Sequence, residues 1–166
     1  MSTARAVALL SVAVLSVVML MGCATEKPAT ATATATAGAL TAAVTPESEV
    51  PLCPAAAPGA KGTAEVTVAP DESSITATVT HSGLSGDPTA AHIHSAPSGV
   101  AGPVVLPFSG SLASPINRTF TAADYVAAAG APPDFPSFVK SLKAGGAYVN
   151  VHTAACKPGE IRGQLK

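Results

Sequence analysis

The sequence predicts a mainly β domain, in which antiparallel strands form a sandwich or a small barrel. Three observations support this fold class. Apolar and polar residues alternate with a period of two in several runs that are rich in Val, Ile and Thr. The chain contains 14 glycines and 15 prolines, many of them between these runs, where they indicate turns. About 120 residues remain after two N-terminal segments are set aside, which is enough for one domain with a core.

The N-terminus has the pattern of an export signal. Arg5 precedes an apolar stretch over 6–20, which is shorter than the ~20 residues that a transmembrane helix needs. Residues 20–23, Leu-Met-Gly-Cys, resemble the lipobox of bacterial lipoproteins. We expect residues 1–22 to be a cleaved lipoprotein signal peptide, and Cys23 to carry the lipid that anchors the protein to a membrane. An uncleaved anchor helix and a plain secretory signal are the alternatives.

The next segment, residues 23–46, is expected to be a flexible tether. It contains a Thr-Ala alternation over 30–37 without large apolar side chains. Such a run cannot bury enough surface to offset the entropy that is lost when a chain becomes ordered. The folded domain is therefore expected to cover residues 47–166.

Six strands are expected in this domain. The first two surround a turn at 70–73 and form a hairpin, and Pro107 places the fourth strand at a sheet edge. One or two short helices are expected before the last two strands: one over 124–129, with Thr121 as its N-cap, and one over 137–144. A Greek-key arrangement is the natural architecture for such a chain. The expected strands are 62–69, 74–81, 90–94, 104–108, 147–153 and 160–165.

Composition narrows the possible functions. Nine Lys and Arg residues nearly balance ten Asp and Glu residues, and no basic run occurs, so nucleic-acid binding is not expected. The chain has no Trp and only 4% aromatic residues, so it has no obvious platform for stacking on sugars. No Ser-His-Asp order, paired acid and base carboxylates or phosphate loop is recognisable. The sequence gives no positive indication of an enzyme.

The three cysteines suggest a protein outside the cytoplasm. With Cys23 assigned to lipid, Cys53 and Cys156 remain as an even pair, and in an exported chain a disulfide between them is the expected state. The alternative is that one of them is a thiolate ligand for copper, because Cys156 lies only four residues after His152.

Three of the four histidines lie in two strand-like runs. His92 and His94 share one face of a strand, because side chains two residues apart point to the same side. In the second run, His152 shares a face with Asn150 and Tyr148. If the two strands are neighbours, the imidazoles converge on the outer face of the sheet. The pattern therefore predicts a surface metal site.

Copper is the expected metal, and zinc is the second choice. Imidazole suits both ions, and Cu(II) binds most tightly among the divalent first-row metals. His81 is a possible fourth ligand, and Asn150, Asp87 and Glu160 are candidates to hydrogen-bond the ligands. The alternative is structural: imidazoles that bond to loop carbonyls and stabilise the edge of the sandwich.

The strand motifs together resemble the CHRD domain, a family first named from chordin. The resemblance runs from about residue 47 to the C-terminus, and it implies an exported bacterial protein in a family of poorly defined function. The motifs are Ala91-His92-Ile93-His94, Gly102-Pro103-Val104-Val105, residues 148–153 and 159–165, with Glu49-Val50-Pro51 and Gly83-Leu84 upstream.

A weaker resemblance connects the histidines to Cu/Zn superoxide dismutases. The order Gly83-Leu84, His92, His94 and then His152 is similar to the order of the copper ligands in those enzymes. It implies a Greek-key barrel with metal on its outer face. The chain departs from that pattern, since it has no obvious bridging histidine and no zinc loop.

Three functional hypotheses follow from these observations. The first is a membrane-tethered copper-binding protein that sequesters, delivers or senses the metal. The second is a structural or interaction module that contacts an extracellular or periplasmic protein without metal. The third, and least favoured, is a copper-dependent redox enzyme.

Overall fold

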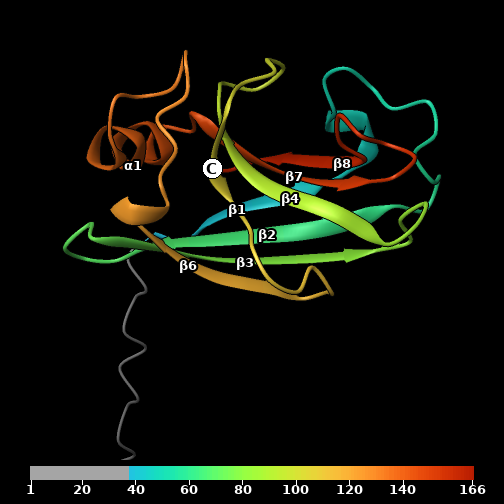
Figure 1. Cartoon of the computed structure of the whole chain (residues 1–166), viewed down its shortest axis with the longest axis horizontal. Coiled ribbons are helices and arrows are strands. Elements are labelled where there is room, and N and C mark those ends of the chain that lie inside the picture. Colours follow the sequence, from blue (N-terminus) through green and yellow to red (C-terminus); the bar gives the residue numbers. More distant parts are fainter. Residues whose placement is uncertain (1–37) are drawn as a thin grey trace, which may run out of the picture. The chain divides into compact units, whose positions relative to one another are not determined.

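Two four-stranded antiparallel sheets pack face to face as a sandwich in the computed structural model, which describes residues 38–166 (Figure 1). The first sheet has the order β1-β2-β3-β6 and the second has the order β5-β4-β7-β8. The predicted antiparallel β fold is thus confirmed, as a sandwich. The strands of the first sheet are β1 (Leu40–Val44), β2 (Lys61–Val68), β3 (Ser74–Ser82) and β6 (Ile116–Thr121). Those of the second sheet are β4 (Pro88–Ser95), β5 (Val104–Pro107), β7 (Ala147–Thr153) and β8 (Ile161–Gln164).

The core lies between the two sheets. Alternation along each strand sends apolar side chains inward, so that the inner faces bury side chains such as Val66, Ile75 and Val79 from the first sheet and Ile93 and Val149 from the second. Burying one such side chain stabilises the fold by ~1.5–3 kcal/mol. The core therefore fixes which face of each strand points outward, and this positions the histidines.

The domain begins earlier than the sequence analysis predicted. Strand β1 lies inside the expected tether, pairs with β2 and buries Leu40 and Val44 in the core. This short strand has only two large apolar residues, four positions apart. Because Ala and Thr surround them, the sequence shows no clear alternation of apolar and polar residues here. The folded domain thus begins by residue 40 and not at residue 47. The expected signal peptide over 1–22, the lipidation site Cys23 and the rest of the tether up to residue 37 lie outside the described residues.

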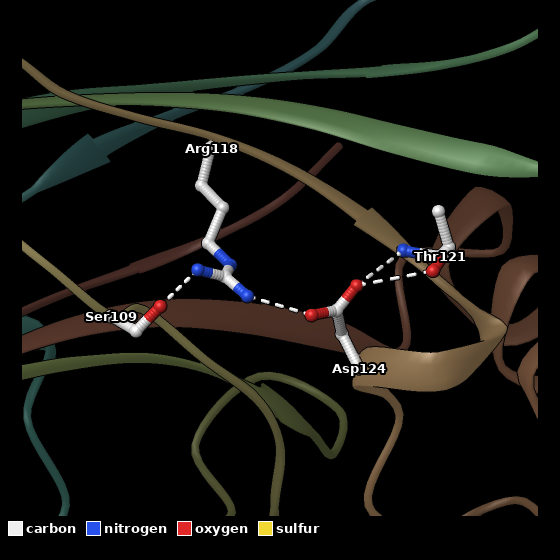
Figure 2. A network of polar contacts seen from close by, with 4 residues as sticks. All are labelled: Ser109, Arg118, Thr121 and Asp124. Carbon is white, nitrogen blue, oxygen red and sulfur yellow. Dashed lines mark hydrogen bonds and ion pairs between the residues drawn. The ribbon is translucent and has the colours of Figure 1, made fainter.

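A single 3-10 turn after β6 stands where the first helix was expected. Thr121 does precede a capping box, but it caps a single 3-10 turn, η2 (Ala122–Asp124). The Asp124 carboxylate accepts hydrogen bonds from the Thr121 amide at 2.9 Å and from Arg118 at 2.6 Å. Arg118 also donates to Ser109, and Figure 2 shows these contacts. The helix does not continue because the Val126 amide donates to the Val105 carbonyl of β5 at 2.9 Å.

The second expected helix is present as α1 (Phe135–Lys143), which begins two residues earlier than predicted. Asp134 caps it by accepting a hydrogen bond from the Ser137 amide at 2.8 Å, and Pro136 in the first turn fits a helix start. The helix buries Phe135, Phe138, Val139 and Leu142.

The predicted disulfide between Cys53 and Cys156 is confirmed. It joins the segment between β1 and β2 to the loop between β7 and β8. Such a disulfide is typical of proteins outside the cytoplasm, and it excludes Cys156 as a thiolate ligand for copper. Within residues 38–166, no helix is both long and apolar enough to cross a membrane.

Candidate metal centre

The three predicted histidines come together on neighbouring strands. Strands β4 and β7 pair in antiparallel register, with His92 opposite Asn150 and Ala90 opposite His152. One nitrogen of each ring lies within 4.8 Å of the other two, a spacing that could hold a metal ion. The pairing of β4 with its other neighbour shifts by a bulge between Ile93 and His94. Bulges of this kind often re-aim a side chain next to a functional site.

A backbone carbonyl fixes the His94 ring. The Nδ1–H group of His94 donates to the Gly102 carbonyl at 2.8 Å. Gly102 can approach this closely because it has no side chain: a Cβ atom there would collide with the Ser95 carbonyl oxygen and with the Ala96 side chain. Since a carbonyl oxygen only accepts, the proton of neutral His94 sits on Nδ1 and a lone pair remains on Nε2.

A second carbonyl does the same for His152. Its Nδ1–H group donates to the Lys157 carbonyl at 2.8 Å, so Nε2 again keeps the lone pair. Hydrogen bonds of this kind, from the distal ring nitrogen to a carbonyl, are the usual way in which proteins orient metal-binding histidines.

The two Nε2 lone pairs face the same oxygen atom. Asn150 Oδ1 lies 3.0 Å from His94 Nε2 and 3.0 Å from His152 Nε2, while the amide nitrogen of Asn150 donates to the Pro158 carbonyl at 3.4 Å. The His152 lone pair can accept a hydrogen bond from the Nδ1–H group of His92, 2.9 Å away. The His94 lone pair, in contrast, faces only another acceptor. A cation between the rings would bind the two Nε2 lone pairs, and its charge would also be attracted to the Asn150 oxygen.

Burial lowers the pKa of all three imidazoles, so they are neutral near pH 7. The pKa of His92 falls to about 4, because burial and then the neighbouring His152 and His94 disfavour its charged form. Burial also lowers the pKa of His94 and His152, although their hydrogen bonds to carbonyls act in the opposite direction. The neutral ring is the form that binds a metal.

The outer side of the second sheet is buried, which the sequence analysis did not predict. We call this side the histidine face, and we define it by His92, His94, Tyr148, Asn150, His152 and Arg162. His94 is 7% exposed and His152 is 8% exposed, and only His92 is half-buried. The expected surface site thus lies beneath loops, with an open side at His92. Neither loop position nor loop coverage is encoded in the alternation of the strands.

The other candidate ligands lie elsewhere. His81 is in β3 of the first sheet, where its Nε2 atom lies 2.8 Å from the Leu112 carbonyl oxygen, and it is not part of the three-histidine cluster. Of the residues expected to support the ligands, Asn150 lies in the site and Asp87 is exposed. Glu160 is buried away from the imidazoles and accepts hydrogen bonds from Ser85, Thr153 and the Ala57 amide.

Three further residues of this region had no assigned role in the site. Tyr148 stacks on His94, with ring centroids 4.6 Å apart and planes 9° apart. The Arg162 guanidinium carbon lies 3.4 Å from the centroid of the Tyr148 ring. Glu49 is 5% exposed, and burial raises the pKa of its carboxyl to about 7, partly offset by the Arg162 charge. The strand alternation places Tyr148 beside Asn150, but only the fold brings Glu49 and Arg162 together.

An antiparallel β-sandwich with a candidate three-histidine metal centre on one sheet is the class of protein that these features define. The chain belongs to the CHRD domain family, whose family model matches residues 40–165. No curated protein and no solved structure matches the chain significantly. The match begins at the first residue of β1, in agreement with the early start of the domain. The resemblance to Cu/Zn superoxide dismutases stays an expectation.

Proposed function

We propose that this CHRD-domain protein is exported, tethered to a membrane through Cys23, and binds one copper ion through His92, His94 and His152. The observation that carries the proposal is the convergence of three ring nitrogens within 4.8 Å, two of them with lone pairs that carbonyl hydrogen bonds aim inward. The Nε2 lone pairs of His94 and His152 both lie 3.0 Å from the Asn150 side-chain oxygen, and a cation bound between the rings would bind both lone pairs.

The donor set favours copper among the common metals. Neutral imidazole suits copper and zinc, and copper binds such sites more tightly in the divalent series. Hard cations such as magnesium and calcium prefer oxygen ligands, and the cluster contains no carboxylate. Three nitrogen ligands leave room for a further ligand on the half-buried His92 side, which suits reversible loading for sequestration, delivery or sensing.

Copper titration of the full chain, purified with its disulfide oxidised, tests this proposal. We expect one equivalent of Cu(II) with nitrogen hyperfine couplings in its spin-resonance spectrum, and one equivalent of Cu(I) under reducing conditions that leave the disulfide intact. His152→Ala should abolish stoichiometric binding, whereas His81→Ala should not change it, because His81 lies in the other sheet.

Failure to bind copper stoichiometrically would contradict the proposal. A tight equivalent of zinc with only weak copper binding would correct the metal and keep the site. If neither metal binds, the histidines are structural and the protein is better explained as an interaction module outside the cytoplasm.

The membrane tether has its own test. Cys23→Ser should move the exported protein from the membrane fraction to the soluble fraction, because lipidation of that residue supplies the anchor. Unchanged membrane fractionation of this variant would contradict the lipid anchor without affecting the copper proposal.

A further inference from the structure

A buried cation stacks behind one of the candidate ligands. The Arg162 guanidinium lies over one face of the Tyr148 ring at 3.4 Å, and the His94 ring lies parallel to Tyr148 at 4.6 Å. All three side chains are on the histidine face, since His94 is opposite Tyr148 and Asn150 is opposite Arg162 in the strand registers. Arg162 is 2% exposed, so solvent screens its charge poorly.

The Arg162 charge has few partners of its own. Its Nη2 atom donates to the Val100 carbonyl at 2.8 Å, and its Nη1 atom has no hydrogen-bond partner among the described residues. Neither of the two ion pairs found within residues 38–166 includes it. The positive charge of Arg162 acts to lower the pKa of the Glu49 carboxyl, against the larger effect of burial. This carboxyl is packed against Gly159, where any side chain would collide with it.

A fixed positive charge affects the two oxidation states of copper differently. Cu(II) carries one more unit of charge than Cu(I), so a nearby buried cation repels it more strongly. The ring of Tyr148 is polarisable and lies between the cation and the ligand, so no layer of water separates them. The ligand cluster contains no carboxylate that would favour the more highly charged ion.

We propose that Arg162, acting through Tyr148 stacked on His94, makes this centre prefer Cu(I), and that the reduced ion is the form of copper the protein carries. This inference rests on the proposed copper function. Arg162 is a positioning and tuning residue here and not a ligand. Across the two stacking distances of 3.4 Å and 4.6 Å, and at an effective dielectric constant of about 20, one extra unit charge changes a binding constant by at least roughly tenfold.

The test compares the Cu(I) and Cu(II) dissociation constants of the same protein, each measured by competition with a chelator of known affinity at pH 8. In Arg162→Gln we expect the preference for Cu(I) over Cu(II) to fall by roughly tenfold. Arg162→Lys, which keeps the charge, should keep most of the preference. Arg118→Gln is the matched control: it removes a cation from the first sheet, and the preference should not change.

Glu49→Gln keeps the inference testable if Arg162 variants do not fold. Removing the negative charge that offsets Arg162 should increase the preference for Cu(I), a change of the opposite sign. One equivalent of copper in every variant, with an unchanged Cu(I) to Cu(II) preference in Arg162→Gln or in Glu49→Gln, would overturn this inference and leave the copper function intact. Absence of stoichiometric copper in the unmodified protein would overturn both.

Discussion

The outer faces of the two sheets are both polar, yet they differ in almost every other respect. The outer face of the first sheet is made largely of threonines that are exposed or half-buried, and we call it the threonine face. Its hydroxyls pair across strands, as between Thr63 and Thr80 at 2.7 Å and between Thr76 and Thr119 at 3.0 Å. The threonines of this face are Thr41, Thr63, Thr67, Thr76, Thr78, Thr80, Thr119 and Thr121.

The histidine face carries ionisable side chains and is covered by loops. Burying imidazole and guanidinium groups costs free energy unless they are fully paired, whereas exposed hydroxyls cost little. Burial shifts the pKa values of His92 and of the nearby Glu49. Buried ionisable groups with shifted pKa values are typical of functional sites, so the histidine face is a candidate. The comparison teaches that alternation alone only says which side chains point outward. Side-chain chemistry and loop coverage distinguish a solvated face from a site.

The largest effect should come from cutting the disulfide that holds the β7–β8 loop, whose Lys157 carbonyl orients His152. Replacing both Cys53 and Cys156 with Ala removes a cross-link between residues 103 apart in sequence. We expect the free energy of unfolding to fall by about 4 kcal/mol, because the unfolded chain gains freedom. Urea unfolding of the variant and of the oxidised protein measures this. A loss below about 1 kcal/mol would contradict the role given to the disulfide.

The next effect concerns the pH dependence of stability that Glu49, which interacts with Arg162 and Asn150 of the histidine face, should produce. The threonine face should show none. The pKa of Glu49 is raised to about 7 in the folded state from an ordinary value of 4.5. The folded protein therefore holds this proton more tightly than the unfolded chain does. Relative to Glu49→Gln, the native protein should lose up to about 3 kcal/mol of stability as the pH rises from 4.5 through 7.

Urea unfolding of both proteins at pH 5 and pH 8 checks this, since contributions from the histidines cancel in the comparison. A difference between the two proteins that does not change with pH would contradict the raised pKa of Glu49.

A smaller effect should follow from disturbing the loop that orients His94. Gly102→Ala places a methyl group against the Ser95 carbonyl, so we expect a destabilisation of about 1–3 kcal/mol and weaker copper binding. Gly86→Ala is a matched control, because a methyl group there has open space. Thermal unfolding and copper titration of both variants measure the effects. Equal stability and equal copper affinity of the two variants would show that the close packing of Gly102 against Ser95 is not needed to orient His94.

The smallest effect should come from the threonine face. Thr76→Ala and Thr119→Ala each remove a hydroxyl from one exposed cross-strand pair, and each should cost less than about 1 kcal/mol. Copper affinity should not change. A large loss of copper binding in either variant would contradict the claim that the threonine face has no part in metal binding.

The alternating strands and the three ligands could be predicted from sequence because both depend on local patterns. Ile93 between two histidines and the valines beside His152 determine which side faces the core. Strands β1 and β6 were not predicted, because β1 is a short run among Ala and Thr and β6 has Arg118 at a position where alternation would place an apolar residue.

The supporting parts of the centre depend on long-range contacts and could not be predicted. The acceptors for His94 and His152 are backbone carbonyls, which every residue has, so residue type gives no signal. The position of Glu49 beside the histidine face follows from the path of the segment after β1, which the disulfide helps to fix.

Anomalous scattering at the copper edge, from crystals of the copper-loaded protein, tests the central claim most directly. The account predicts one copper peak at roughly 2 Å, a typical metal–imidazole distance, from Nε2 of His94, Nε2 of His152 and Nδ1 of His92. No peak among these three rings, or a peak only at His81 or another surface position, would contradict it.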